Sequence, residues 1–182
     1  MITDMKHRQL ILYIAASLDG YIARPDGDIG WLSMVEAPPE DYGYAEFVET
    51  VDTIIMGRKT YEKVLSFGIP WPHKGRKCYV LSKTQTGSDE NVEFFNGDAT
   101  DLVASIRQNP GLNIYCDGGA EVVQALVQRD LIDRYVISII PVLLGDGVAL
   151  FKPGRSQHDL TLLKSEAYPS GLVQLHYERK RG

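Results

Sequence analysis

Short apolar runs alternate with helical apolar stripes along this chain, and that alternation restricts it to one class of fold. Residues 10–16 and 135–140 are almost uninterrupted apolar runs, typical of strands buried on both faces of a sheet. Residues 120–128 instead place their apolar side chains on one face of a helix. The pattern predicts an α/β fold with a mixed, mostly parallel central sheet and flanking helices.

Further elements follow from the same periodicities. We expect all 182 residues to form a single domain that ends in an antiparallel hairpin, and residues 26–30 to form a loop. The expected strands are residues 10–16, 21–23, 53–56, 78–81, 92–95, 114–116, 135–140, 160–166 and 172–177. The expected helices begin at residues 38–41, 60, 98 and 120.

Charge and cysteine content exclude several classes of protein. The net charge of −5 argues against nucleic-acid binding, which requires a basic face. No apolar stretch approaches the roughly 18 residues of a membrane span. Cys78 and Cys116 lie in apolar runs and are expected to be reduced core thiols of a cytoplasmic protein. The four histidines lack metal-ligand spacing, so we expect no metal site.

Three expected strands end in groups suited to binding phosphate. Glycines at two of these ends precede helices, whose N-termini attract anions, and the third end, residues 81–84, carries two hydroxyls and an ammonium group. Taken separately, each segment also fits an ordinary helix cap, a tight turn or an exposed loop. The residues concerned are Gly57, Arg58, Lys59, Thr60, Leu81, Ser82, Lys83, Gly118, Gly119, Ala120 and Glu121.

One ligand with a pyrophosphate and a separate phosphate would use all three strand ends. NADPH is such a ligand, and the basic cluster of Arg58, Lys59 and Lys83 favours it over NADH. The chain has no Gly-x-Gly-x-x-Gly fingerprint after a strand, no P-loop and no Gly-x-Ser-x-Gly elbow. NADPH is therefore the expected cofactor.

Five segments in order resemble the dihydrofolate reductase-like superfamily. They are residues 15–23, 55–62, 79–82, 117–120 and 141–147. The chain is most similar to the branch that contains the riboflavin-biosynthesis reductase domain, the C-terminal part of the bifunctional deaminase-reductase. The resemblance covers nearly the whole chain.

The resemblance implies a dihydrofolate reductase-like fold, NADPH as the hydride donor and a homodimer, which is frequent in the superfamily. It places Ala15, Ala16 and Ile22 at the nicotinamide end. It implies a pterin-like or ribosylamino-pyrimidine substrate, as in a 5-amino-6-(5-phosphoribosylamino)uracil reductase. A true dihydrofolate reductase and a non-catalytic NADPH-binding module are the alternatives. The chain has no zinc-ligand motif of the kind a deaminase needs.

Two carboxylates are candidate proton donors, because a carboxyl group in an apolar pocket stays protonated near neutral pH. Asp19 matches a loop that borders the substrate in the riboflavin branch, although Asp-Gly also favours a hairpin turn. Asp41 has the spacing of the folate reductase carboxylate, with Glu46 and Glu49 as rivals and helix capping as the alternative. Water is the third possible donor.

Four further residues are candidates for substrate binding. Trp31 lies where the superfamily's mobile loop carries a tryptophan, and core packing is its alternative role. Tyr44 and Phe47 share a helix and can stack on a flat heterocycle, although Phe47 also suits the core. Arg76 resembles the arginine that holds a substrate carboxylate, and an exposed loop residue is the competing interpretation.

Overall fold

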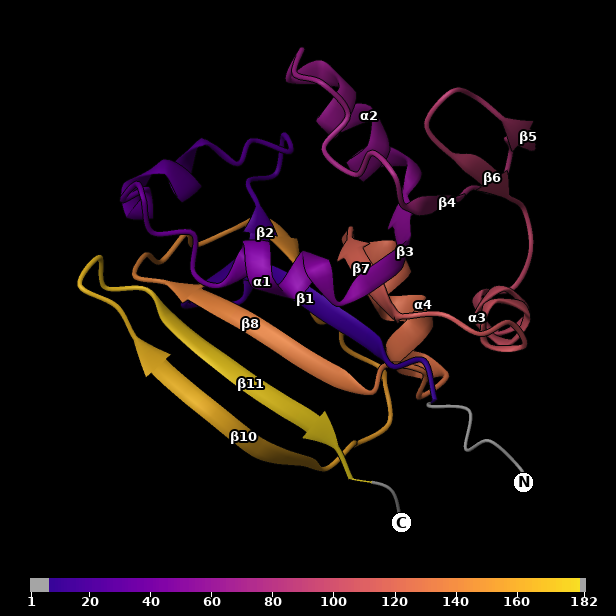
Figure 1. Cartoon of the computed structure of the whole chain (residues 1–182). Coiled ribbons are helices and arrows are strands. Elements are labelled where there is room, and N and C mark those ends of the chain that lie inside the picture. Colours follow the sequence, from indigo (N-terminus) through magenta and orange to yellow (C-terminus); the bar gives the residue numbers. More distant parts are fainter. Residues whose placement is uncertain (1–6, 181–182) are drawn as a thin grey trace.

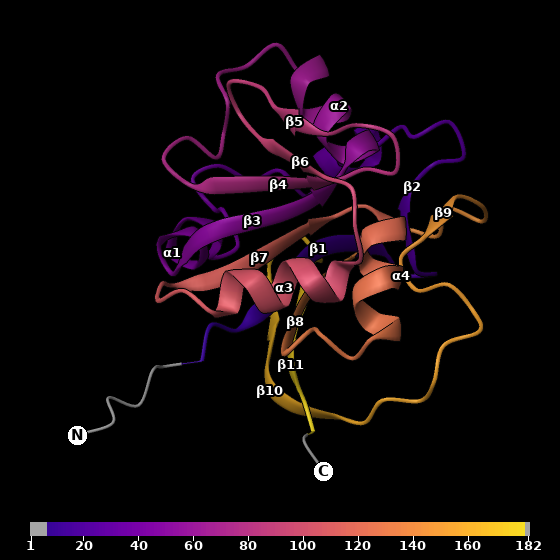
Figure 2. The same ribbon diagram turned by 90° about the vertical axis from the view of Figure 1, so that its right-hand side faces the viewer.

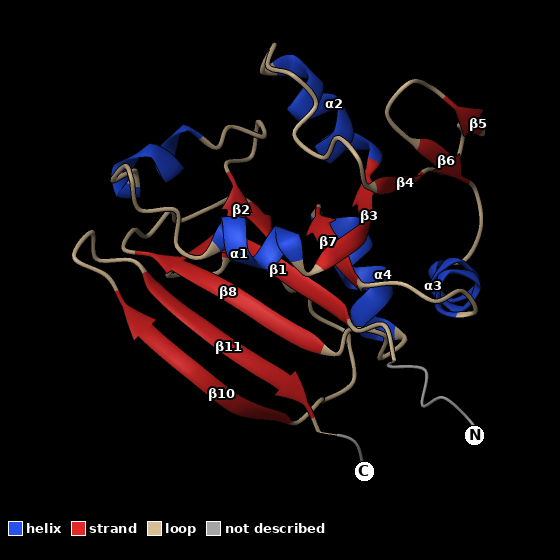
Figure 3. Cartoon of the chain, viewed as in Figure 1, coloured by secondary structure: helices blue, strands red, loops and turns tan. Residues whose placement is uncertain are grey.

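A computed structural model describes residues 7–180 and has a nine-stranded sheet at its centre (Figures 1 and 3). The strands are β1 (Leu10–Ser17), β2 (Tyr21–Ala23), β3 (Val51–Gly57), β4 (Lys77–Leu81), β5 (Gly87–Ser88), β6 (Glu93–Phe95), β7 (Asn113–Gly118), β8 (Arg134–Ile140), β9 (Val148–Ala149), β10 (Leu160–Ala167) and β11 (Val173–Arg179). Their order in the large sheet is β10-β11-β8-β1-β7-β3-β4-β6-β5, and β2 pairs separately with β9.

The middle of the sheet is parallel and its ends are antiparallel. From β8 through β1, β7, β3 and β4 to β6, every neighbouring pair runs parallel. β11 joins β8 in the antiparallel sense and β10 joins β11, which confirms the terminal hairpin. The carboxyl ends of the parallel strands therefore lie at one edge of the sheet, where ligands of open α/β sheets usually bind.

Helices cover both faces of the sheet. They are α1 (Tyr44–Glu49), α2 (Arg58–Ser66), α3 (Ala99–Arg107) and α4 (Ala120–Gln128), with a 3₁₀ helix, η1 (Gly30–Val35). Figure 2 shows α3 and α4 together on one face, where their apolar residues pack on Leu12, Ile55 and Cys116. On the other face, Tyr44 and Phe47 of α1 pack against a second cluster that includes Tyr115.

Most expected elements are confirmed. The helix at Ala120–Gln128 has the expected bounds, and Asp98 caps α3 by accepting a hydrogen bond from the Thr100 N–H at 2.7 Å. Both cysteines are free and buried, as expected for core thiols.

One local expectation is wrong. No helix starts at residues 38–41, because α1 begins only at Tyr44. The preceding residues form a short bridge between Ala37 and Glu40, and Gly43 turns the chain with a φ of 79°. The segment between β2 and α1 also contains η1, whose Trp31 and Val35 are buried.

The described residues contain neither a candidate membrane span nor a candidate metal centre. No helix within residues 7–180 is long and apolar enough to cross a bilayer. The same residues contain no group of three or more His, Cys, Asp or Glu side chains arranged to hold a metal ion.

Candidate active site

The three expected phosphate-binding segments meet at one edge of the sheet. β3 lies between β4 and β7, with Gly57 paired to Leu81 on one side and Met56 paired to Gly118 on the other. The ends of these strands are therefore neighbours, as the sequence predicted. A ligand with several phosphates can contact all of them at once.

The glycines at this edge keep the space between β3 and β7 open. A Cβ atom on Gly119 would lie 3.1 Å from the Thr60 hydroxyl oxygen. A Cβ atom on Gly57 would lie 3.2 Å from a methyl of Val122 and 3.8 Å from the Gly119 nitrogen. Larger residues would close this space, which suits close approach of a phosphate to the backbone.

The two helices that begin here have no side-chain caps. Gly57 precedes α2 and Gly119 precedes α4, and neither makes a side-chain capping hydrogen bond. α3, whose N-terminus follows β6, is instead capped by Asp98. The first N–H groups of α2 and α4 therefore lack side-chain acceptors. The positive ends of the two helix dipoles lie at these N–H groups, where they can attract an anion.

Basic side chains surround these helix starts. The pKa of Glu121 is lowered first by its hydrogen bond to Lys152, and the charges of Lys83 and Lys59 lower it further. Lysines from three segments therefore place positive charge near the Glu121 carboxylate at the beginning of α4. Lys152 was not predicted from the sequence, because it follows β9 and no motif marks it.

Two of the expected phosphate ligands already have local partners. Arg58 forms an ion pair with Glu62 one turn along α2. The Ser82 hydroxyl oxygen accepts hydrogen bonds from the N–H groups of Thr84 and Gln85 at 3.3 and 3.0 Å. The Ser82 hydroxyl can still donate its proton, so both residues keep donors for an anion.

A cavity of about 400 Å³ lies beside β1 and α1. Apolar side chains from η1, β8 and the start of β11 form much of its wall, and three tyrosines add aromatic surface. Its lining comprises Tyr13, Ala15, Leu32, Val35, Glu36, Ala37, Pro38, Glu40, Asp41, Tyr42, Tyr44, Ser138, Ile140 and Leu172. A flat heterocycle fits a cavity of this volume and composition.

A buried glutamine fixes one wall of this cavity. The Gln174 amide donates hydrogen bonds to the Tyr13 hydroxyl at 3.0 Å, to the Ser138 hydroxyl at 3.2 Å and to the Tyr42 carbonyl at 3.1 Å. The Tyr13 hydroxyl in turn donates to the Tyr42 carbonyl at 2.8 Å. These bonds hold the two tyrosines in place, and no periodic pattern in the sequence marks them.

The structure brings some predicted ligand-binding residues to the cavity and others to the core. Ala15 and Tyr44 line it. Ala16 is buried and Ile22 packs against the same core cluster, so neither side chain forms the wall. Phe47 stacks on Tyr13 with ring centroids 4.6 Å apart and serves mainly in packing.

The proposed closing role of Trp31 is not supported. Its side chain packs with Val35, Ile140 and Leu172, and the residue is only 7% exposed. Core packing, the alternative interpretation, is correct. Leu32, the next residue of η1, takes the place on the cavity wall.

The expected substrate role of Arg76 is wrong. Its guanidinium donates to the Val48 carbonyl at 2.8 Å and to the Val51 carbonyl at 3.2 Å. It therefore joins the end of α1 to the start of β3. This position lies at the amino ends of the parallel strands, away from the glycine edge.

Asp41 lies at the rim of the cavity beside β1, and its carboxylate caps α1. It is exposed, and its two oxygens accept hydrogen bonds from the N–H groups of Gly43 and Ala45, each at 2.9 Å. The capping alternative is therefore correct.

Asp19 connects two loops at the carboxyl edge of the sheet. Its carboxylate accepts hydrogen bonds from the Ser17 hydroxyl at 2.6 Å and from the N–H groups of Leu144 and Gly145 at 3.1 and 2.7 Å. The hydrogen bond from Ser17 is the main cause that lowers the Asp19 pKa. A raised pKa was expected, so the structure contradicts Asp19 as an acid that stays protonated near neutral pH.

The contact between these loops should depend on pH in the acid range. Because the folded pKa of Asp19 is lowered, its stabilising contribution is complete above the unfolded pKa of 3.8 and disappears as the pH falls through the folded pKa. We expect the Gly145 amide proton signal in NMR to titrate below that value, and Asp19→Asn to abolish the titration. A midpoint above 3.8 would contradict this assignment.

A pair formed by the buried His73 and the partly buried Asp117, at the end of β7, is the main feature that the sequence reasoning missed. Asp117 immediately precedes the two glycines, and its Oδ2 lies 3.1 Å from Nε2 of His73. Its Oδ1 accepts a hydrogen bond from the Tyr115 hydroxyl at 2.6 Å. His73 is 3% exposed, and no pattern in the loop around it marks it as a partner of Asp117.

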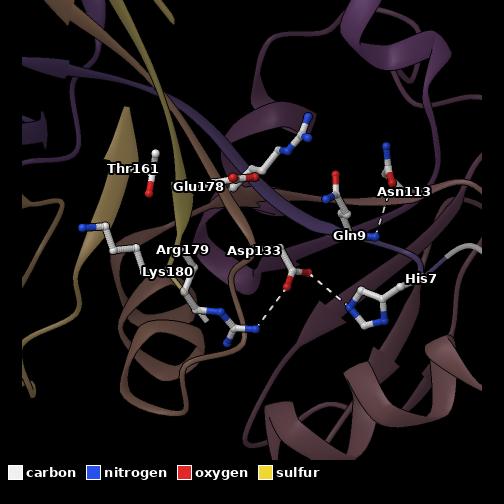
Figure 4. Close-up of a pocket in the computed structure, with 9 residues that line it drawn as sticks. His7, Gln9, Asn113, Asp133, Thr161, Glu178, Arg179 and Lys180 are labelled. Atoms are coloured by element: carbon white, nitrogen blue, oxygen red, sulfur yellow. Dashed lines mark hydrogen bonds and ion pairs between the residues drawn. The ribbon is translucent and has the colours of Figure 1, made fainter. Parts of the chain in front are cut away.

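A larger, polar cavity of about 700 Å³ lies near the start of β1 and the end of β11. Figure 4 shows Asp133 at its centre, with Arg179 and His7 beside it. Asp133 also accepts hydrogen bonds from the Leu10 N–H and from Arg107. Asp133 pairs with Arg107 and Arg179, and the cavity lies at the end of the sheet remote from the glycines, so we assign it a structural role.

Comparison with known proteins gives consistent results. The family model of the RibD C-terminal domain matches residues 8–174. The uncharacterized protein YwjB of Bacillus subtilis (strain 168) is 42% identical over 94% of this chain and 98% of its own length. YyaP of the same strain is 32% identical over 97% of this chain and 98% of its own length.

Solved structures share the fold. A protein from Shewanella sp. PV-4 described as a riboflavin biosynthesis protein is 38% identical, with a TM-score of 0.88 over 95% of this chain and 99% of that one. A Thermotoga maritima diaminohydroxyphosphoribosylaminopyrimidine deaminase/5-amino-6-(5-phosphoribosylamino)uracil reductase is 14% identical, with a TM-score of 0.72. That match covers 96% of this chain and 57% of the Thermotoga chain, and at this identity it shows the fold only.

Proposed function

Since the chain belongs to the RibD C-terminal domain family, a family of reductase domains, we propose that it is an NADPH-dependent reductase. Its substrate would be a small pterin-like heterocycle or a ribosylamino-pyrimidine. The observation that carries the proposal is the meeting of three strand ends, two uncapped helix N-termini and three lysines at one edge of the sheet. The same domain holds a cavity of heterocycle size.

The residues present fit the proposed cofactor. The open backbone at Gly57 and Gly119 and the first N–H groups of α2 and α4 would hold the pyrophosphate. Lys59, Lys83 and Lys152 would bind the additional phosphate that distinguishes NADPH from NADH. When bound, NADPH supplies the hydride, and the protein supplies orientation and a dry site.

The cavity beside β1 would hold the substrate ring. Tyr13 and Tyr44 provide aromatic surface, while Leu32, Val35 and Leu172 exclude water. Asp19 and Asp41 already accept backbone hydrogen bonds, so we propose that water supplies the proton. Hydride addition to a C=N or C=O carbon and protonation of the neighbouring heteroatom complete the reduction.

A true dihydrofolate reductase is the second candidate, and one observation disfavours it. The carboxylate that would hold the pteridine is expected at Asp41, but Asp41 is exposed and caps α1. A non-catalytic module would bind NADPH without turnover. Assays of NADPH oxidation with 5-amino-6-(5-phosphoribosylamino)uracil and with dihydrofolate separate the three possibilities.

NADPH should raise the thermal midpoint of unfolding far more than NADH does. At a concentration near 100 times Kd, a ligand adds about 2.7 kcal/mol to the stability of the folded state. For a domain of this size that corresponds to a shift of roughly 5–10 °C. The measurement is a thermal melt with each nucleotide. Equal shifts would refute the proposed contact with the additional phosphate, and no shift with either would refute the reductase assignment.

A further inference from the structure

β7 contains one extra residue immediately before the two glycines of the expected phosphate site. Two consecutive residues of β3, Ile55 and Met56, pair with Cys116 and Gly118 of β7, which are not consecutive. The residue between them is Asp117, and the pairing of β7 with β1 ends at Cys116. Asp117 therefore has no partner in either neighbouring strand, and β7 bulges at this point.

The bulge decides which residues of β7 face the start of α2. A shift of one residue along a strand exchanges the side chains that point to the two faces of the sheet. Without the bulge, Asp117 would pair with Met56, and both glycines would move one place further along β3. With the bulge, a Cβ atom on Gly119 would lie 3.1 Å from the Thr60 hydroxyl oxygen. The bulge thus sets the position of the open backbone that the phosphates need.

Two side chains hold the Asp117 carboxylate. A carboxylate only accepts hydrogen bonds, so the Tyr115 hydroxyl donates to Oδ1 at 2.6 Å and Nε2 of His73 donates to Oδ2 at 3.1 Å. Tyr115 belongs to β7 itself, whereas His73 lies in the loop between α2 and β4. Among these two donors, only His73 joins the bulge to another part of the fold.

The loop that carries His73 is itself packed against α2. The Trp71 ring meets the His73 ring edge to face, with centroids 5.2 Å apart, and meets the Tyr61 ring of α2 in the same way at 5.6 Å. His73 is 3% exposed and Tyr61 is 5% exposed. This packing restricts the imidazole, so its hydrogen bond to Asp117 has a fixed direction.

We propose that His73 is a positioning residue for the cofactor, which holds the bulge at Asp117 and so keeps the glycine turn in register with the start of α2. The inference rests on the proposed function, because that function assigns the pyrophosphate of NADPH to this turn. The oxygens of a pyrophosphate need backbone N–H groups at fixed positions. Without the His73 donor, Asp117 is bonded only to its own strand, and the bulge is free to shift along β7.

Replacement of His73 tests this role with and without the cofactor. His73→Leu should raise the Kd for NADPH by at least about tenfold, in a fluorescence titration at a temperature where circular dichroism shows the protein folded. His73→Gln, whose Nε2 also donates, should stay within about threefold of wild type. In NMR of the cofactor-free protein, cross-strand NOEs between Met56 and Gly118 should be present in wild type and His73→Gln and absent from His73→Leu.

A second pair of variants shows whether His73 acts through Asp117. Asp117→Ala removes the acceptor and should give the same loss, which keeps the test valid if His73→Leu does not fold. Because both changes break one contact, the double variant should bind NADPH no more than about twofold more weakly than either single variant.

Tyr61→Phe is the matched control for loss of a buried hydrogen bond. The Tyr61 hydroxyl donates to Asp89 at 2.5 Å, and phenylalanine keeps the ring that contacts Trp71. This variant should retain the NADPH affinity and the NOEs even if its thermal midpoint falls.

The outcomes distinguish this inference from the proposed function. Retention of the NOEs between Met56 and Gly118 in His73→Leu overturns the inference whatever NADPH does. Unchanged NADPH affinity in folded His73→Leu, an equal loss in Tyr61→Phe or fully additive losses in the double variant also overturn it. Absence of NADPH binding to wild-type protein contradicts the reductase proposal, while the NOEs still show whether His73 holds the register.

Discussion

Replacement of Gly119 with valine should weaken NADPH binding by at least about 100-fold. A Cβ atom at this position would lie 3.1 Å from the Thr60 hydroxyl oxygen, and the two γ-methyl groups of valine would fill the remaining space beside Gly57. The proposed pyrophosphate needs that space to reach the first N–H groups of α2 and α4. The measurement is a fluorescence titration with NADPH, at a temperature where circular dichroism shows the variant folded.

The backbone at Gly119 permits this substitution, which makes the result interpretable. Its φ of −68° and ψ of −170° are open to any residue, so the change acts by occupying space. Gly119→Ala should give a smaller loss, because alanine lacks the γ-methyl groups. Gly30→Val is a suitable control, since a Cβ atom there would meet only the exposed side chain of Asp28. Unchanged NADPH affinity in Gly119→Val would contradict the proposed phosphate site.

The arrangement of the strand ends could be predicted from the sequence because local signals marked them. Apolar runs identified β3, β4 and β7, glycines followed two of them, and parallel pairing brings the ends of such strands to the same edge. The helix at Ala120–Gln128 was equally well marked by its apolar stripe. In each case the signal lies within a few residues of the element it defines.

The contacts of single polar side chains could not be predicted in the same way. His73 and Asp117 are 44 residues apart, and only the fold brings them together. Asp41 and Arg76 have a recognisable spacing but were less informative. Asp41 accepts a hydrogen bond from a backbone N–H at the start of α1, and Arg76 donates one to a carbonyl at the end of the same helix. Aspartate and arginine serve local backbone groups as readily as ligands, so their spacing alone does not distinguish the two roles.

The second large effect that we expect is a loss of folding stability when Asp133 is replaced. Its carboxylate is 4% exposed and accepts hydrogen bonds from the Leu10 N–H at 2.8 Å, Arg107 at 2.6 Å and Arg179 at 3.3 Å. It thereby joins the start of β1, the end of α3 and the end of β11. Removal of the Asp133 carboxylate leaves buried positive charges and a buried backbone N–H without the acceptor that compensates them.

Asp133→Ala should therefore lower the free energy of unfolding by about 3–5 kcal/mol. For a chain of this length we expect the thermal midpoint to fall by roughly 10 °C or more. Thr161→Ala, on the exposed rim of the same cavity, should change the free energy of unfolding by less than about 0.5 kcal/mol. NADPH affinity should stay unchanged in both variants wherever the protein is folded. A loss of NADPH affinity in folded Asp133→Ala would show that this end of the sheet contributes to ligand binding, because the glycine edge would otherwise retain all its proposed contacts.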